Sequence, residues 1–430
     1  MVTYEALEAM FSPVWIFINQ ASGGIFEVLV YPVAVFSIFF YFFAISGFFY
    51  KKNILKVKAI TSSKLPKITI QIPTYNEIVA IRCAKKCLNM IYPKDKYEII
   101  IGDDSTDKSI SKEIDSFAKK HKNVRVTRRG TNKGFKPGNL NHMLKFTKGD
   151  IIVIFDSDFT PSRNFLKNIV RPFVEDKKVA CVQAKWAYSN MSQNRTSKFA
   201  SMILMVYHNL IAKINQALGV PLLFGSGEAI RKSVLTKLGG WKEGSLTEDV
   251  DYAIRVLKSG YKTIYLENVS APGEVPFTLK GLRIQQRRWA YGNVKVFMNN
   301  WKAILKGNFS VLQKIMLFFT LTGYVGSLLL IAFLLFGTVS FITTTPAPID
   351  VYNFTKDVSI NFVIASGFMI AGLVALVKNK KIRYCGTVVL AALTIGMVVS
   401  VSVSIGLFKA AIGKKMNWTM IEKVGNKTSI

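Results

Sequence analysis

Four stretches of the chain lack any charged residue and are long enough to cross a membrane. They are Val28–Tyr50, Ile315–Ile342, Val358–Val377 and Tyr384–Phe408, and a bilayer core of about 30 Å needs ~20 apolar helical residues. A polar region of about 260 residues separates the first two stretches, which is enough for one substantial domain core. The pattern therefore predicts a soluble domain inserted between transmembrane helices.

The polar region alternates short apolar runs with segments of helical periodicity. Strands are expected within residues 67–77, 96–107, 123–130, 149–161 and 179–188. Helices are expected between them, at 80–90, 109–120 and 140–147. Nearly continuous apolar strands that alternate with helices are typical of a mostly parallel, doubly wound sheet. The predicted fold is therefore a Rossmann-like α/β domain.

Three of the predicted strands end in polar clusters, at 74–77, at 103–105 and at 156–158. Ligands of such sheets bind beyond the carboxyl ends of the strands. Asp156 and Asp158 project to the same side because they are two residues apart, and two adjacent carboxylates are stabilised by a hard divalent cation. The alternative is a solvated turn, since Asp and Ser are ordinary turn residues.

The segment LTEDVDYAIRVLKSGYK (246–262) predicts a helix. Thr247 is expected to cap its start, with Glu248 and Asp249 in the first turn. These acids could serve only the helix dipole, or one could act as a general base on an acceptor hydroxyl.

The segment QQRRWAYG (285–292) crowds amides, guanidinium groups and an indole just before the second apolar stretch. One interpretation is a basic segment anchored at the lipid headgroups; the other is a site for an anion and a sugar ring. An amphipathic helix follows, within the segment 281–310. Its apolar positions are Val294, Phe297, Met298, Trp301, Ile304 and Leu305, with lysines between them.

A formal net charge of +31 first suggests a nucleic-acid partner. No RNA-binding aromatic motif, zinc knuckle or helix-turn-helix pattern accompanies that charge, so nucleic acid is not expected. A basic face suits anionic lipid or a phosphate-bearing substrate. The cysteines are interpreted as structural thiols of a reducing compartment, because they form no metal-binding set: Cys83, Cys87, Cys181 and Cys385.

The distribution of lysines predicts the orientation in the membrane. The charged side chains that precede the first apolar stretch are all acidic, and Lys51 and Lys52 follow the stretch directly. The positive-inside rule therefore places residues 1–27 outside and the large domain in the cytoplasm. The lysine-bearing tail, 409–430, is expected in the cytoplasm too, so the stretch 384–408 is interpreted as re-entrant, interfacial or split.

The order of motifs IPTYNE, DDSTD, KGFKPGNLN, FDSDF, TED and QRRW resembles the membrane-embedded β-glycosyltransferases of glycosyltransferase family 2. Within that family the chain is most similar to cellulose synthases and cellulose-synthase-like mannan synthases, over about residues 65–425. The tail NWTMIEKVG (417–425) resembles their gating segment. The chain departs from the family pattern at Ile421, where Thr is usual, in KPGNL, and in GSGE (225–228).

This resemblance implies a GT-A catalytic domain over 51–280 and a role for each matching residue. It implies that Asp249 is the general base and that Asp156 and Asp158 bind the donor diphosphate through Mg²⁺ or Mn²⁺. One or both of Asp103 and Asp104 would help to hold the nucleoside, and Lys136 would lie near the diphosphate. The other implied substrate-binding residues are Pro73, Tyr75, Glu77, Glu248, Gln285, Arg288 and Trp289.

The predicted function is inverting transfer of a hexose from UDP-glucose or GDP-mannose to a growing β-linked polysaccharide. The alternative is transfer of a single sugar to diacylglycerol or a polyprenyl phosphate. A receptor without enzymatic activity would not explain the acids at the strand ends. The expected location is the inner or plasma membrane, with helices at 28–50, 315–342 and 358–377; the oligomeric state stays open.

Overall fold

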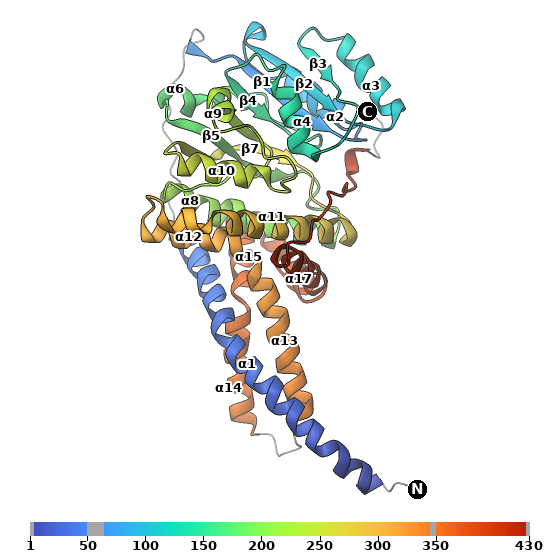
Figure 1. Cartoon of the computed structure of the whole chain (residues 1–430), viewed down its shortest axis with the longest axis vertical. Coiled ribbons are helices and arrows are strands. Elements are labelled where there is room, and N and C mark those ends of the chain that lie inside the picture. The colour runs from blue at the N-terminus through green and yellow to red at the C-terminus, as the bar shows by residue number, and fades with distance from the viewer. Residues whose placement is uncertain (1–3, 50–63, 345–349, 427–430) are drawn as a thin grey trace.

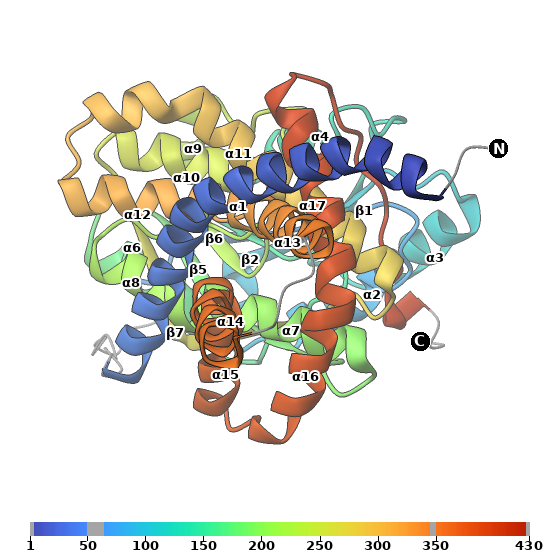
Figure 2. The ribbon, with the colours of Figure 1, turned by 90° about the horizontal axis from the view of Figure 1, so that it is seen from below.

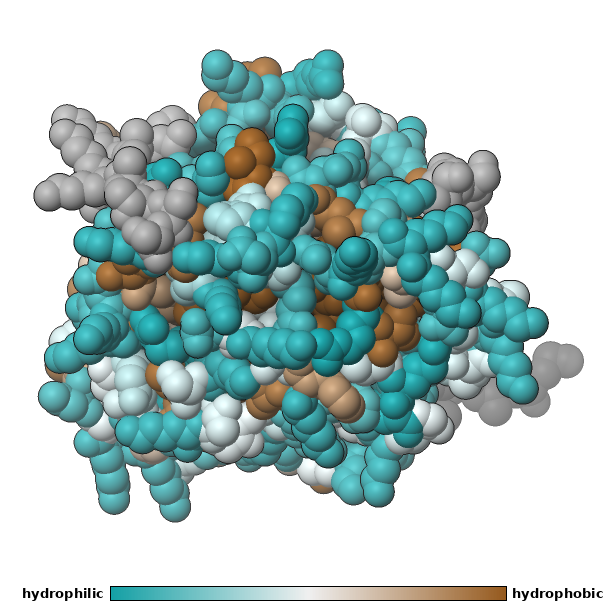
Figure 3. Space-filling view, turned by 90° about the horizontal axis from the view of Figure 1, so that it is seen from above, coloured by the Kyte–Doolittle hydropathy of each residue, from teal (hydrophilic) through white to brown (hydrophobic). Residues whose placement is uncertain are grey.

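The structure is a computed structural model that describes residues 4–49, 64–344 and 350–426. Figure 1 shows an α/β domain, a layer of helices lying crosswise beneath it, and a stem of long helices. Helix α1 (Tyr4–Phe49) starts at the far end of the stem and reaches the crosswise layer. The face of the domain opposite the stem is mostly hydrophilic (Figure 3). The polar and apolar parts of the sequence thus occupy opposite ends of the molecule.

A seven-stranded sheet forms the centre of the domain, in the order β3-β2-β1-β4-β6-β5-β7. Strands β1 to β4 are parallel, β6 is antiparallel to both of its neighbours, and β7 is parallel to β5. The strands are β1 (Ile68–Thr74), β2 (Tyr97–Asp103), β3 (Val124–Thr127), β4 (Ile151–Ile154), β5 (Val179–Tyr188), β6 (Glu228–Arg231) and β7 (Lys262–Gly273). The predicted mostly parallel, doubly wound sheet is confirmed. Strands β6 and β7 were missed, because the first is short and polar residues interrupt the second.

Each face of the sheet is covered by its own apolar core. On β2, Ile99 and Ile101 belong to one core and Ile100 to the other. Neither face of the strand meets water, which explains why its apolar residues follow one another without alternation. The covering helices are α2 (Ala80–Leu88), α3 (Lys108–Lys119), α4 (Phe135–Leu144), α5 (Phe165–Ile169), α6 (Arg171–Glu175), α7 (Arg195–Val206), α8 (Ala212–Ala217), α9 (Lys232–Lys237) and α10 (Glu248–Lys258).

The crosswise layer contains α11 (Leu279–Lys306) and α12 (Val311–Thr322) (Figure 1). Met298, Trp301 and Leu305 of α11 are exposed, as the predicted interfacial helix requires. The predicted span 315–342 is not one helix, because its first residues belong to α12 and the rest belong to a separate helix that starts at Val325. A hydrogen bond of 2.8 Å from Gln313 Nε2 to the carbonyl of Leu218 holds α12 against the domain.

The stem combines α1 with α13 (Val325–Thr343) and with a bent pair of helices, α14 (Val351–Ala365) and α15 (Gly367–Lys378). By length and composition, α1 and α13 can each cross a membrane. The pair α14 and α15 bends by 62° and can do so only as one broken span. Where 358–377 predicts one straight helix, the structure has this bend.

The last apolar stretch runs across the stem rather than along it (Figure 2). It consists of α16 (Cys385–Ala391), a π-helical turn (Ala392–Gly396) and α17 (Met397–Ala411), and by length and composition this run could span a membrane. A Cβ on Gly406 would lie 2.7 Å from the carbonyl oxygen of Arg287, so α17 packs directly beneath α11. Its exposed face carries an apolar stripe at helical spacing, Val398, Val401, Ile405 and Phe408. This placement favours the interfacial interpretation of 384–408.

Several residues used in predicting the orientation lie outside the described residues. They are Lys51, Lys52 and Lys427.

Candidate active site

One pocket lies at the carboxyl ends of β1, β2 and β4, where the polar clusters were predicted to converge. Residues of α4, α10 and α11 also line it, together with the C-terminal tail (residues 412–426). Every predicted site residue except Asp103 borders this pocket: Pro73, Tyr75, Glu77, Asp104, Lys136, Asp156, Asp158, Glu248, Asp249, Gln285, Arg288 and Trp289.

Asp103 and Asp104 have different surroundings, because successive residues at a strand end point to opposite sides. Asp103 is 2% exposed and accepts hydrogen bonds from Arg128 Nε at 2.8 Å and Ser111 Oγ at 2.7 Å. Asp104 borders the pocket, and Arg129 Nη2 holds it at 2.7 Å. The predicted role of Asp103 in donor binding is therefore not supported, because its carboxylate is committed to the fold.

Helix α4 begins earlier than the helix predicted at 140–147, and the extra turn builds the site. Gly134 precedes it with φ of +74°. A Cβ on Gly138 would lie 2.4 Å from Arg129 Nη1, so only glycine leaves room for the guanidinium that holds Asp104. The early start also brings Lys136 to the pocket.

Lys136 lies beside the first carboxylate of the predicted cation site. Its Nζ donates to Asp156 Oδ1 at 2.8 Å and to the carbonyl of Gly225 at 2.6 Å, and it lies 3.7 Å from Glu248 Oε1. Burial opposes the ionisation of Asp156, but the ammonium groups of Lys136 and Lys423 lower its pKa below the ordinary value. Asp156 is thus a carboxylate at neutral pH.

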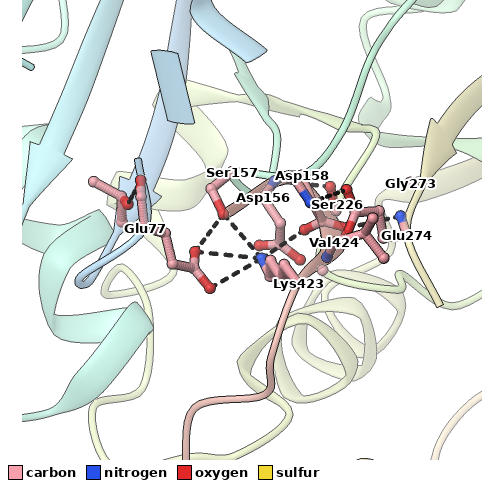
Figure 4. Close-up of polar contacts among 12 residues, drawn as sticks. Glu77, Asp156, Ser157, Asp158, Ser226, Gly273, Glu274, Lys423 and Val424 are labelled. Carbon is pink, nitrogen blue, oxygen red and sulfur yellow. Dashed lines mark hydrogen bonds and ion pairs between the residues drawn. The ribbon is translucent and has the colours of Figure 1, made fainter. Parts of the chain in front are cut away.

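The second carboxylate, Asp158, is contacted by a lysine of the tail (Figure 4). Lys423 Nζ donates to Asp158 Oδ1 at 2.6 Å and to Ser157 Oγ at 2.9 Å, and it lies 3.3 Å from Glu77. Ser157 also donates to Glu77. The ammonium group of Lys423 therefore contacts a carboxylate that the sequence predicts to bind a metal ion.

The tail is anchored immediately after Lys423. Glu274 accepts the backbone N–H of Val424 at 2.6 Å and that of Gly425 at 3.0 Å, and Arg82 binds the same carboxylate at 2.7 Å. A Cβ on Gly425 would lie 2.4 Å from Val79 Cγ2, so a larger residue would not fit. This anchor fixes the end of the segment that carries Lys423 into the pocket.

Helix α10 starts at the pocket wall with Glu248 and Asp249. Thr247 precedes it but makes no side-chain cap, and its Oγ1 is buried without a partner, so that part of the prediction is wrong. Burial, and next the neighbouring Glu248, raises the pKa of Asp249 to about 7. A carboxyl with that pKa is suited to take up a proton at neutral pH.

Helix α11 covers the pocket with Gln285, Arg288 and Trp289. Burial lowers the pKa of Arg288, while Glu248, Asp156 and Asp249 oppose that shift. Arg288 Nε is buried without a hydrogen-bond partner, which leaves a donor for a ligand.

Gly292 brings α11 close to the start of α10. A Cβ at Gly292 would lie 2.4 Å from Thr247 Cγ2. The glycine of QQRRWAYG thereby lets the two motifs form one site.

Aromatic rings form two further parts of the pocket wall. Trp186 and Trp289 lie with their centroids 6.5 Å apart. At the other side Trp418 of the tail approaches Tyr75 at 6.0 Å and Phe135 at 6.4 Å. Such apolar faces can stack on sugar rings or on a nucleobase.

The sequence predictions omitted several pocket residues. Lys423 and Trp418 lie in the segment recognised as gating-like, so their motif could have identified them. Trp186 lies in the predicted strand 179–188 and Glu274 lies 11 residues before Gln285, but their approach to the pocket depends on the pairing of β5 with β7, which the sequence did not predict.

The pocket combines groups that suit an anionic substrate and a proton transfer. Carboxylate oxygens of Asp156 and Asp158 are the hard ligands that Mg²⁺ or Mn²⁺ prefers, and the ammonium on Asp158 shows that a cation is stabilised there. Among the described residues, no group of three or more His, Cys, Asp or Glu side chains could hold a metal ion. Any ion at this pair therefore needs further oxygen ligands from a substrate or from water.

Comparison with known proteins gives one family match and several relatives. Residues 151–356 match the model of "Glycosyl transferase family group 2". A probable glucomannan 4-beta-mannosyltransferase 7 of Oryza sativa subsp. japonica is 32% identical over 54% of this chain and 41% of its own length. Glucomannan 4-beta-mannosyltransferase 7 of Arabidopsis thaliana is 26% identical over 85% of this chain and 66% of its own length. The chain thus spans about half the length of the curated relatives it matches.

A solved structure supports the fold. The mannosyltransferase PcManGT from Pyrobaculum calidifontis, in complex with GDP-Man and Mn²⁺, aligns with a TM-score of 0.61 at 20% identity. The alignment covers 84% of this chain and 99% of that chain. At this identity the likeness concerns the fold, which agrees with the predicted GT-A class.

Proposed function

We propose that the protein is an inverting membrane glycosyltransferase, because residues 151–356 match the model of "Glycosyl transferase family group 2". It transfers a hexose from a nucleotide sugar to the hydroxyl of a growing β-linked polysaccharide. The observation that carries this proposal is the pocket itself, where an acid with a pKa of about 7 lies among cationic groups.

The proposed reaction is a single displacement. Asp249 takes the proton of the acceptor hydroxyl as that oxygen attacks the anomeric carbon and the bond to the diphosphate breaks. Arg288, with its unpartnered Nε, stabilises the negative charge on the departing nucleoside diphosphate. Attack opposite to the leaving group inverts the anomeric centre.

The donor binds across the carboxyl edge of the sheet in this proposal. Tyr75, Phe135 and Asp104 surround the nucleoside, and Lys136 approaches the diphosphate. Asp156 and Asp158 are the residues that would hold a divalent ion, Mg²⁺ or Mn²⁺. When bound, that ion supplies charge neutralisation at the leaving group. An ion bound through Asp158 Oδ1 would compete with Lys423 Nζ, which lies 2.6 Å from that oxygen.

The names of the relatives favour mannose as the transferred sugar and a polysaccharide as the acceptor. We therefore place GDP-mannose before UDP-glucose as donor, and polymer before lipid as acceptor. Trp186 and Trp289 provide the stacking surface that a polysaccharide end would use.

Membranes containing the protein are expected to convert radiolabelled GDP-mannose, with Mn²⁺ or Mg²⁺, into an ethanol-insoluble product. Parallel incubations with UDP-glucose test the other donor, and the Asp249→Asn variant controls for endogenous activity. Label extractable into chloroform would instead show a lipid acceptor. Absence of transfer from both donors, by folded protein, would overturn the proposed function.

The proposed location is a cell membrane, inner or plasma, with the catalytic domain in the cytoplasm. The stem crosses the bilayer as α1, α13 and the pair α14 and α15, while α16 and α17 lie at the surface. Three crossings put residues 1–27 outside and the tail on the side of the domain, which the contact between Lys423 and Asp158 requires.

A cysteine introduced at the exposed Lys415 is expected to react with an impermeant maleimide only after the cells are permeabilised. The same test at the exposed Tyr352, at the start of α14, serves as the matched outside control. Labelling of position 415 in intact cells would contradict this arrangement.

A further inference from the structure

The segment GSGE (225–228) places a carboxyl group behind the wall that contains Asp249. Glu228 is the first residue of β6 and is 1% exposed. It pairs with Ile154 on one side and with Gln183 on the other, so its backbone is held within the sheet. A fully buried acid within a sheet needs a structural or functional reason, because burial of an ionisable group is unfavourable.

The side chain of Glu228 reaches the turn that borders the pocket. Its Oε2 accepts the backbone N–H of Gly225 at 3.1 Å. The carbonyl oxygen of Gly225 accepts a hydrogen bond from Lys136 Nζ at 2.6 Å. One peptide segment therefore connects the buried acid to the ammonium that lies beside Asp156 and Glu248.

Gly225 also contacts the proposed base. Its φ is +82°, a conformation that glycine adopts without strain. A Cβ there would lie 3.1 Å from Asp249 Oδ2 and 3.3 Å from Lys136 Nζ. Asp249 Oδ2 and Lys136 Nζ therefore both lie on the side of Gly225 where a Cβ would project, and the position of this turn affects how the two groups are placed.

We propose that Glu228 is a positioning residue for catalysis: by holding the Gly225 turn it keeps Lys136 beside the general base Asp249. This inference rests on the proposed function of Asp249 and assigns a role to the segment in which the chain departs from the family pattern. Glu228 itself does not border the pocket, so it acts through Gly225 and Lys136.

The contact of Glu228 with the N–H of Gly225 requires a hydrogen-bond acceptor at position 228. Burial raises its pKa well above the ordinary value, and Asp249 raises it further, while Lys136 opposes the shift. Burial therefore opposes the ionisation of Glu228, and an oxygen of its carboxyl group can accept the N–H of Gly225 in either protonation state. Glutamine offers the same acceptor with the same length.

The charged groups that face Asp249 come from four elements. Glu248 lies on α10, Lys136 on α4, Arg288 on α11 and Glu228 on β6. Burial and Glu248 raise the pKa of Asp249, and Lys136 lowers it. Loss of the Gly225 turn would let Lys136 move away, and the pKa of Asp249 would then rise above about 7.

The test compares the Glu228→Gln and Glu228→Ala variants with the wild-type protein across pH, using kcat/KM for the donor. In the wild type, kcat/KM is expected to decrease as the pH is lowered through about 7, because protonated Asp249 cannot act as a base. This decrease is the acidic limb of the pH profile. The Gln variant should keep this limb in place. The Ala variant should lose activity about 10- to 100-fold and move the limb to higher pH.

Two further variants keep the test decisive. Glu228→Asp retains the acid but shortens it by one methylene, so it should shift the limb as Ala does, even where Ala impairs folding. Glu98→Ala removes an acid that binds Arg125 on β3, away from the pocket, and should leave the limb unmoved.

An unmoved limb in both Glu228→Ala and Glu228→Asp, or a Gln variant as impaired as Ala, would overturn the positioning role. Failure of the proposed function has a different signature, because the wild type itself would then transfer no sugar or Asp249→Asn would remain active.

Discussion

The Asp249→Asn variant is expected to lose about 10²–10⁴-fold in kcat, the range that positioned general bases contribute. Asparagine has nearly the same size and still accepts hydrogen bonds, but it cannot take the proton of the acceptor hydroxyl. Donor affinity should stay within a few-fold, because the proposed nucleoside and diphosphate contacts come from other residues. The measurement is initial-rate transfer together with calorimetric binding of the nucleoside diphosphate.

Asp251→Asn provides a matched control in the same helix. Asp251 is 4% exposed, but its carboxylate binds Arg255 Nε at 2.9 Å and does not border the pocket. Its loss should lower stability and leave kcat of the folded protein nearly unchanged. Turnover by Asp249→Asn within a few-fold of the wild type would show that another group is the base.

The Asp158→Asn variant is expected to bind Mn²⁺ at least ~10-fold more weakly and to lose about 10²–10³-fold in kcat, as when one electrostatic group at a leaving oxygen is removed. The amide is a poorer ligand for a hard cation than a carboxylate. Electron paramagnetic resonance of Mn²⁺, titrated in the presence of nucleoside diphosphate, measures the affinity without relying on activity.

Lys423→Met is the variant that separates the metal site from the tail. It retains an unbranched side chain one atom shorter than that of lysine and removes the ammonium that lies 2.6 Å from Asp158. Because the carboxylate then has no internal cation, Mn²⁺ should bind more tightly than to the wild type. Equal Mn²⁺ affinity in the wild type, Asp158→Asn and Lys423→Met would show that Asp158 does not hold the ion.

The proposed exchange of Lys423 for the ion links metal binding to the conformation of the tail. The anchor at Glu274, Val424 and Gly425 keeps the segment near the pocket, so Lys423 needs to move only a short way. Trp418, five residues before Lys423, borders the pocket near Tyr75. We therefore expect ordering of the tail and occupation of the donor site to affect each other, because the tail contacts the pocket through Trp418 and through Lys423.

The sequence alone determined the layers of this protein. Strands buried on both faces are mostly apolar, and membrane helices lack charges, so the composition of most stretches predicts their environment. The ends of β1 and β4 likewise revealed Glu77, Asp156 and Asp158, because strand ends of a parallel sheet meet at one edge. The ordered motifs identified α10 and α11 as the other walls.

Only the tertiary structure decided which of these groups act on one another. Nothing local distinguishes Asp103 from Asp104, but the side of the strand end commits one to Arg128 and leaves the other at the pocket. The crosswise course of α17 depends on its packing beneath α11, which hydrophobicity does not encode.

The sequence alone also does not predict the contacts of Lys423 with Asp158 and of Glu228 with Gly225. The first pair is far apart in the chain, and the second depends on an antiparallel strand too short to be predicted. The periodicity of apolar residues indicates which face of a segment is exposed to solvent. Which charged groups pair depends on distances between residues that are set only in the folded structure.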